Sequence, residues 1–119
     1  MTPTCAVNAI VLPVKFLDRR LFPRRRARGI VRCRPANKPF HRPIRARLLD
    51  ISQGGVGIQT TEDIAVNAML ELQLESAAGV FQVVRQAEVR WVTRESDGRY
   101  RLGCCLEKRL TFAEMQRFV

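Results

Sequence analysis

Apolar and polar residues alternate along most of the chain after residue 28, which is the period expected of β-strands with one buried face. The segment 69–75 is the clearest case, because Leu70, Leu72 and Leu74 fall on one face. Similar patterns predict further strands, at residues 29–34, 44–51, 56–60, 79–93 and 100–106. We therefore expect an all-β fold of about six antiparallel strands.

The longest predicted strand, residues 79–93, has one irregular position. Its apolar residues are in phase with one another: Phe81, Val83, Ala87, Val89 and Trp91. Arg85 falls on the same face and interrupts it. A charged side chain on an apolar face predicts a bend or a β-bulge close to Arg85.

Turn-forming residues separate the strands. Ser52-Gln53-Gly54-Gly55 and Ser96-Asp97-Gly98 predict tight turns, and three prolines make residues 35–43 a loop. After the last strand, Thr111-Phe112-Ala113-Glu114 has the form of a capping box and predicts a short C-terminal helix over residues 111–119. A small antiparallel sheet of this kind is expected to close into a six-stranded β-barrel, because closure removes exposed strand edges.

The first 28 residues differ from the rest of the chain. We interpret residues 1–17 as an N-terminal extension with a short strand at residues 9–14. Residues 18–28 form a basic arm that Pro23 breaks, so a continuous helix is not expected there. The predicted domain, with its arm and its helix, therefore spans residues 18–119.

Positive charge is concentrated in the first part of this 119-residue chain, whose net charge is +10. Between Lys15 and Arg47 there are 13 Lys and Arg residues and one acidic residue, Asp18. From Leu48 to Val119 there are 8 basic and 10 acidic residues. Such an asymmetric charge distribution favours an anionic partner: a nucleotide, a nucleic acid, an acidic lipid or an acidic protein.

The sequence carries little that indicates catalysis or metal binding. No set of nucleophile, base and orienting group is recognisable, and His41 has no Cys or His at a ligand-like spacing. We therefore expect no enzyme activity, no metal and no cofactor. The four cysteines include no C-x-x-C pair and are interpreted as free thiols, which with the absence of a secretory signal pattern favours a cytoplasmic protein.

Two short motifs do indicate a binding function when they are taken together. Arg20 and Arg24 form R-x-x-x-R on the basic arm. Asp50, Ser52 and Gly55 form D-x-S-x-x-G about two dozen residues further on, at the end of a predicted strand. Either motif alone is more often a solvated basic run or ordinary turn chemistry.

In this order the two motifs resemble the PilZ domain family of cyclic di-GMP receptors. The likeness extends to Val89-Arg90-Trp91-Val92 and Tyr100-Arg101-Leu102-Gly103-Cys104, which resemble the last hairpin of that family. The resemblance implies a PilZ-like β-barrel, a signalling function and cyclic di-GMP as the ligand. It also implies the ligand-binding residues, which are Arg19, Arg20, Arg24, Asp50, Ser52 and Gly55, with Arg19 favouring a stacked pair of ligands.

The residue types suit such a ligand. The planar fork of arginine can bind guanine O6 and N7 or a phosphate. An ionised Asp50 only accepts hydrogen bonds, and can take them from guanine N1–H and the exocyclic amine. Ser52 adds a donor or acceptor, which strand alternation would place on the same side as Asp50. Gly55 permits a tight turn and close approach of the ligand.

Several alternatives remain open at this point. Arg24 and Arg28 also satisfy R-x-x-x-R, so the arm has two registers. The chain can instead be a small basic module for RNA or DNA, although its few aromatic residues are not interleaved with basic ones. A third alternative is a family member that binds only proteins. The leading prediction is an adaptor with a downstream protein partner; a homodimer is left open, and neither nucleic acid nor a membrane is expected as partner.

Overall fold

The computed structural model describes residues 24–38 and 40–119. Its elements are β1 (Arg25–Arg26), β2 (Gly29–Pro35), β3 (Ile44–Ile51), β4 (Gly55–Thr60), β5 (Met69–Ser76), β6 (Gln82–Arg94), β7 (Tyr100–Leu106) and α3 (Phe112–Gln116). The six strands predicted from the alternating pattern correspond to β2 through β7. The predicted strand at residues 9–14 lies outside the described residues.

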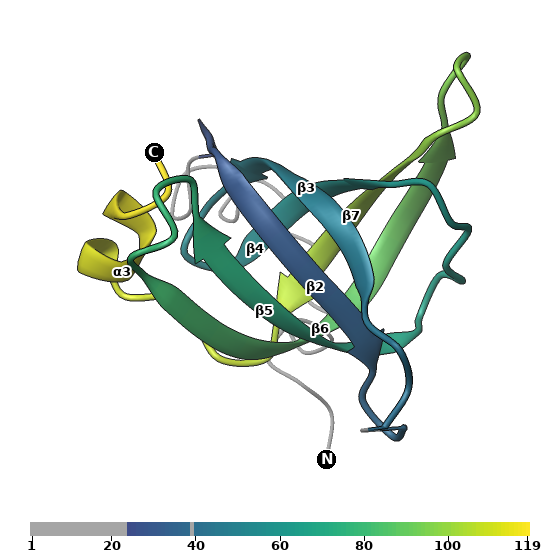
Figure 1. The fold of residues 1–119 in the computed structure, drawn as a ribbon, viewed down its shortest axis with the longest axis horizontal. Helices are drawn as coiled ribbons and strands as arrows, with labels where there is room; N and C mark the ends of the chain where they lie inside the picture. Colours follow the sequence, from purple (N-terminus) through teal and green to yellow (C-terminus); the bar gives the residue numbers. More distant parts are fainter. Residues whose placement is uncertain (1–23, 39) are drawn as a thin grey trace, which may run out of the picture.

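The strands form a closed antiparallel barrel (Figure 1). They are ordered β1-β3-β2-β5-β6-β7-β4, and an additional pairing between β3 and β4 closes the sheet on itself. The strands β2 to β7 make up the barrel, and β1 is a short extra strand beside β3. The prediction of an all-β, six-stranded antiparallel barrel is confirmed.

Apolar side chains from every strand of the barrel fill its interior. On β5 the burial alternates residue by residue, and Leu72 and Leu74 are fully buried. Val31 and Cys33 on β2 and Leu102 on β7 are fully buried too. Because each strand gives one face to this core, the opposite faces point outward and are available for other contacts.

The irregularity in β6 lies further along the strand than the sequence predicted. Arg85 stays in register opposite Leu72 of β5. The pairing with β7 shifts between Val89 and Trp91, so Arg90 is the extra residue of a bulge. The bulge turns Trp91 to the outside, where it is 38% exposed. The predicted bulge near Arg85 and the predicted inward phase of Trp91 are therefore wrong.

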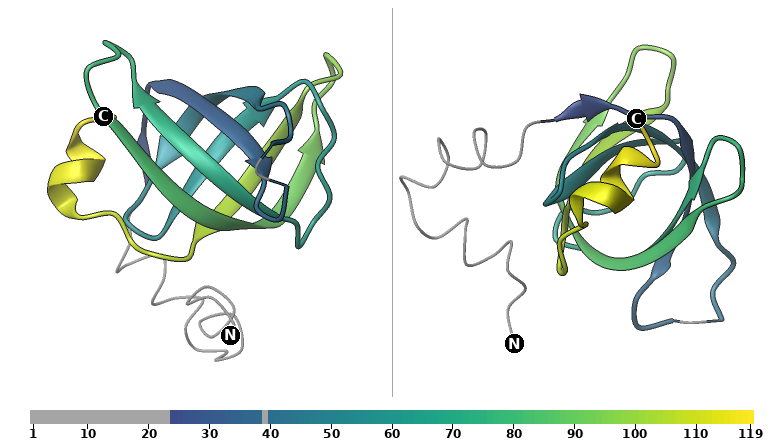
Figure 2. Two further views of the ribbon diagram at one scale, coloured as in Figure 1. Left: turned by 60° about the horizontal axis from the view of Figure 1, so that its bottom comes forward. Right: turned by 90° about the vertical axis from the view of Figure 1, so that its left-hand side faces the viewer.

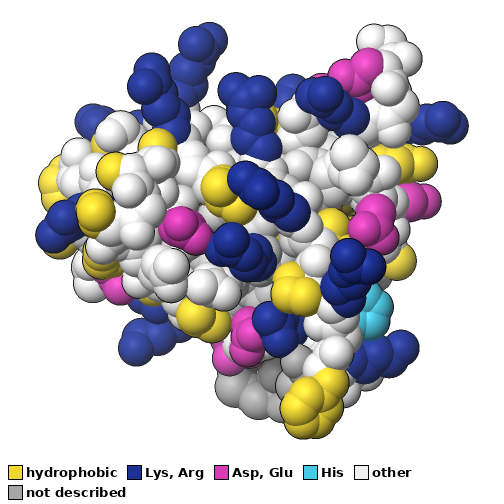
Figure 3. All heavy atoms as spheres, viewed as in Figure 1, with side chains coloured by type: hydrophobic (Ala, Val, Ile, Leu, Met, Phe, Trp, Pro, Cys, Tyr) yellow, Lys and Arg dark blue, Asp and Glu magenta, His cyan; other side chains and the backbone are white. Residues whose placement is uncertain are grey.

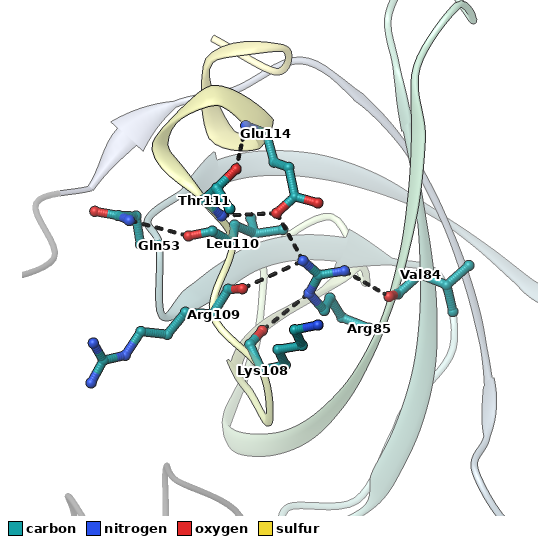
Figure 4. A network of polar contacts seen from close by, with 8 residues as sticks. All are labelled: Gln53, Val84, Arg85, Lys108, Arg109, Leu110, Thr111 and Glu114. Carbon is teal, nitrogen blue, oxygen red and sulfur yellow. Dashed lines mark hydrogen bonds and ion pairs between the residues drawn. The ribbon is translucent and has the colours of Figure 1, made fainter.

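Arg85 is accommodated by polar contacts to the segment that follows β7 (Figure 4). Its guanidinium donates to the carbonyl oxygens of Val84, Lys108 and Arg109, and Nη2 lies 2.8 Å from Oε1 of Glu114. These contacts supply the partners that a mostly buried guanidinium requires. No bend of β6 is needed at this position.

The predicted C-terminal helix is confirmed, although α3 ends at Gln116. The Oγ1 atom of Thr111 accepts from the Glu114 backbone N–H, and the Glu114 carboxylate accepts from the Thr111 N–H, as a capping box requires. Figure 2 shows α3 lying across one end of the barrel. After the helix, Phe118 is buried and its carbonyl oxygen accepts from the Arg28 N–H at 2.8 Å. The C-terminal segment thus holds the point where the arm joins the barrel.

The cysteines differ in their surroundings. Cys33 and Cys104 are free and buried, and burial raises the pKa of each thiol to about 12. The prediction of free thiols is confirmed for these two residues; Cys105 lies on the opposite side of β7 and is half-buried, and Cys5 is outside the described residues. In the part of the chain that the structure describes, no helix is long and apolar enough to cross a membrane.

Candidate ligand-binding site

A row of cross-strand neighbours runs across five strands on the outside of the barrel. Arg26 of β1 is opposite Asp50 of β3, and Asp50 is opposite Gly57 of β4. Gly57 is opposite Gly103 of β7, and Gly103 is opposite Trp91 of β6. The row therefore places a cation and a carboxylate at one end, an aromatic ring at the other and two glycines between them.

A β-bulge in β3 puts Asp50 on the outer face. Ala46 and Leu48 are buried, so uninterrupted alternation would also direct residue 50 inward. The pairing with β4 shifts between Leu48 and Asp50, which makes Leu49 the extra residue. Asp50 then points outward, and Ile51 returns to the core. A carboxylate is thereby kept out of an apolar interior where its desolvation would be unfavourable.

The two glycines leave room for the side chains at the ends of the row. A Cβ atom on Gly57 would lie 2.7 Å from both carboxylate oxygens of Asp50. A Cβ atom on Gly103 would lie 2.1 Å from Nε1 of Trp91. Asp50 and Trp91 thus lean over the glycines from opposite sides, which a larger residue at either position would prevent.

The Asp50 carboxylate has unused hydrogen-bonding capacity. Its Oδ1 atom is buried and has no hydrogen-bond partner among the described residues. Nη1 of Arg24 lies 3.8 Å from this Oδ1 atom, and the Arg24 side chain is 59% exposed. A buried acceptor without a donor is uncommon in folded proteins and calls for an explanation. A bound molecule that donates hydrogen bonds would satisfy it.

A cavity of about 780 Å³ lies beside Asp50. Its volume is within the range of small-molecule sites. It is lined by Arg26, Ala27, Arg28, Arg47, Leu48, Leu49, Asp50, Arg101 and Val119. Four of these residues are arginines, and Asp50 is the acidic one among them. The cavity therefore suits an anionic ligand that also carries hydrogen-bond donors for Asp50.

Ser52 and Gly55 shape the turn that follows Asp50. The Ser52 backbone N–H donates to the Gly55 carbonyl oxygen at 2.9 Å, and the Gly55 N–H donates to Oγ of Ser52 at 3.1 Å. Ser52 is 5% exposed and lies just after the end of β3, the strand that carries Asp50. A Cβ atom on Gly55 would lie 2.7 Å from the Cys104 carbonyl oxygen, which explains the glycine. Neither residue lines the cavity.

The same turn is fastened to the segment between β7 and α3. The Leu110 N–H donates to the Gln53 carbonyl oxygen, and the Gln53 side chain donates to the Leu110 carbonyl oxygen. The Leu106 N–H donates to the carbonyl oxygen of Gly54. These bonds fix the end of β3 and thereby the backbone that carries Asp50.

The structure brings together part of the predicted site. Arg24 and Asp50 lie side by side, whereas Arg19 and Arg20 fall outside the described residues. The sequence reasoning did not single out the outward arginines of the cavity wall, Arg26, Arg47 and Arg101. For Arg47 the signal was its phase, since it lies between the buried residues Ala46 and Leu48. Figure 3 shows that Lys and Arg side chains are also spread over the face that presents β2 and β3.

Comparisons with known proteins agree with this architecture. The family model described as PilZ domain matches residues 18–119. No curated protein sequence matches the chain. Among solved structures, the chain is similar to the inhibitor of motility MotI/DgrA of Bacillus subtilis, with 17% identity and a TM-score of 0.63; the match covers 80% of this chain and 47% of that one. The chain thus spans about half the length of that protein.

Two further structures have the same fold. The PilZ domain of YcgR from Escherichia coli, solved with cyclic di-GMP, is 16% identical with a TM-score of 0.59, and the match covers 83% of this chain and 87% of that one. MrkH of K. pneumonia in its apo state is 22% identical with a TM-score of 0.57, with 79% and 45% covered. The match of the family model, which includes every described residue, assigns the family together with the barrel. The chain belongs to the PilZ domain family.

Proposed function

We propose that this protein is a receptor for cyclic di-GMP. The observation that carries the proposal is the outward carboxylate of Asp50, which has an unpartnered oxygen and lies beside a cavity lined by four arginines. The ligand combines what these groups require, because guanine donates hydrogen bonds and the two phosphates are anionic. The YcgR domain of the same fold was solved with this ligand.

In the proposed complex Asp50 accepts hydrogen bonds from N1–H and the exocyclic amine of one guanine. The glycines Gly57 and Gly103 let the Asp50 carboxylate and the Trp91 indole lie close against the barrel surface, from which both can contact the base. Trp91, at the far end of the row, offers an aromatic face for stacking. The row of cross-strand neighbours thus supplies both the polar and the apolar contacts that a purine needs.

The arm would complete the site. Arg24 is 3.8 Å from Asp50, so an arm that contains Arg19, Arg20 and Arg24 can reach the cavity from one side. Like charges on the arm repel one another, and two ligand phosphates would neutralise them. We propose that the arm closes over the ligand and thereby changes a surface that binds a downstream protein. Direct contacts from Ser52 and Gly55 to the ligand are part of this proposal.

The proposed role is that of a receptor and adaptor in signalling, without catalysis of its own and without a metal or cofactor. A cytoplasmic location is proposed with it.

Titration with cyclic di-GMP tests the proposal against its main alternative. We expect saturable binding at physiological salt, with loss of affinity in Asp50→Ala and in Arg24→Ala of about 1–3 kcal/mol each. A basic module for RNA or DNA would instead bind oligonucleotides with an affinity that falls steeply as salt is raised. If the chain binds oligonucleotides in this way and does not bind the cyclic dinucleotide, the receptor function is wrong and the protein is a nucleic-acid-binding module.

A further inference from the structure

Two arginines of the barrel wall, Arg47 and Arg101, form a second row beside the row of Asp50. Arg47 of β3 is opposite Gln59 of β4, and Gln59 is opposite Arg101 of β7. Neighbouring strands are roughly 4.8 Å apart, so the two arginine backbones are separated by about 10 Å. Both side chains point outward and line the cavity. They belong to the rigid barrel and not to the arm.

The bulge at Leu49 is what brings Arg47 and Asp50 to one face. The two residues are three positions apart, and in a regular strand they would point to opposite faces. Because Leu49 is the extra residue, both point outward and both line the cavity. A cation and an acceptor are therefore presented together, at about the spacing of two residues along a strand, roughly 7 Å.

The present partner of Arg101 holds it weakly. Nε of Arg101 lies 3.9 Å from Oε2 of Glu95, and the Arg101 side chain is 46% exposed. Glu95 also accepts a hydrogen bond from the Gln59 side chain at 2.6 Å, so it has another donor. An ion pair this long and exposed contributes little to stability. The Arg101 guanidinium can therefore turn toward a ligand without a large loss.

We propose that Arg47 and Arg101 form a phosphate-binding subsite on the barrel wall, which holds one phosphate of the cyclic dinucleotide while Asp50 binds a guanine. This inference rests on the proposed function. Two guanidiniums that flank one point suit a group with several acceptor oxygens. A phosphate has such oxygens, whereas the edge of a single base does not. The subsite is built before the ligand arrives, in contrast to contacts from a closing arm.

Calorimetric titration of the full chain with cyclic di-GMP tests the subsite, using Arg47→Gln and Arg101→Gln. Arg45→Gln is the matched control, because Arg45 is exposed on the same strand two residues before Arg47 and does not line the cavity. We expect each cavity variant to bind about tenfold more weakly than the natural chain, and the control to bind within about twofold. Arg47→Lys and Arg101→Lys keep the charge and should lose less affinity than the glutamine variants.

The outcomes separate this inference from the proposed function. If the natural chain binds and both cavity variants retain its affinity, the subsite is wrong and the receptor function stands. If Arg45→Gln loses as much affinity as the cavity variants, the effect is general attraction and the subsite is wrong as well. If the natural chain does not bind cyclic di-GMP, the receptor function fails and the subsite fails with it.

Discussion

Asp50 and Gly57 are direct cross-strand neighbours, and the carboxylate of Asp50 occupies the space that a side chain at position 57 would need. A Cβ atom there would lie 2.7 Å from both Asp50 oxygens. The glycine is therefore a requirement for the orientation of Asp50, although it belongs to neither sequence motif. It extends the candidate site onto β4.

Gly57→Ala is expected to weaken cyclic di-GMP binding by about tenfold, or 1.4 kcal/mol, while the free energy of unfolding changes by less than about 1 kcal/mol. The atoms in conflict are the end of a side chain, so Asp50 can rotate away and the fold is kept. A double-mutant cycle with Asp50→Asn provides the check: the second substitution should add little to the loss from the first. Additive losses would show that Gly57 does not act through Asp50.

Trp91 and Gly103 give a spectroscopic test of the other end of the row. The chain has one tryptophan, so its intrinsic fluorescence reports on Trp91 alone. Gly103→Ala should displace the indole from Gly103 and move the emission to longer wavelength, because the ring becomes more exposed to water. Cyclic di-GMP should change the emission of the natural chain. An emission spectrum that changes neither with the substitution nor with the ligand would contradict the proposed stacking surface.

The contacts of Arg85 predict a stability effect separate from binding. Arg85→Ala removes donors to Val84, Lys108, Arg109 and Glu114, and should lower the free energy of unfolding by about 1–3 kcal/mol. Arg85 does not line the cavity, so ligand affinity should stay within about twofold of the natural value. Chemical denaturation and titration on the same samples would measure both. An unchanged denaturation midpoint would contradict the structural role.

Glu114 adds a pH dependence. Hydrogen bonding to the Thr111 backbone N–H, with the charge of Arg85, lowers the pKa of Glu114 from its ordinary value of 4.5. Since the folded pKa is below the unfolded one, the stabilisation is complete above pH 4.5 and is lost as the pH falls through the folded pKa. Melting curves of Glu114→Gln should therefore differ from those of the natural chain at neutral pH and approach them in acid. A difference in melting temperature that stays the same at every pH would contradict a stabilising role of the ionised Glu114 carboxylate.

The buried thiols predict chemical inertness. With a pKa of about 12, only about one in ten thousand Cys33 or Cys104 side chains is ionised at pH 8. Iodoacetamide should leave both unmodified in the folded protein and alkylate both in guanidinium chloride, as peptide mass spectrometry can measure. Rapid alkylation under native conditions would mean that this part of the barrel opens.

Periodicity predicted the barrel well because each strand buries one face. The bounds predicted for β3 and β7 coincide with those in the structure. The bulges were not predictable in the same way. Arg85 gave a false signal, since its partners Lys108, Arg109 and Glu114 come from another part of the sequence. Leu49 gave only a weak signal, because two apolar residues in succession, Leu48 and Leu49, also fit the end of a strand.

The site was predictable only where it consists of short motifs. Arg24 and Asp50 were found this way, and the structure places them together. Gly57, Gly103 and Trp91 join the row through strand register, which depends on both bulges and on the closure of the sheet. Contacts between distant strands cannot be read from local pattern, so these residues required the structure.

Isothermal titration of cyclic di-GMP into the natural chain and into Asp50→Ala, at physiological salt, measures whether Asp50 binds this ligand. We expect saturable binding by the natural chain with a Kd below about 100 μM, and binding by the variant that is at least tenfold weaker. Thermal unfolding of both proteins would establish that each is folded. No heat of binding for a folded natural chain, or equal affinity of the two proteins, would contradict a role of Asp50 as the guanine-binding residue of a cyclic di-GMP receptor.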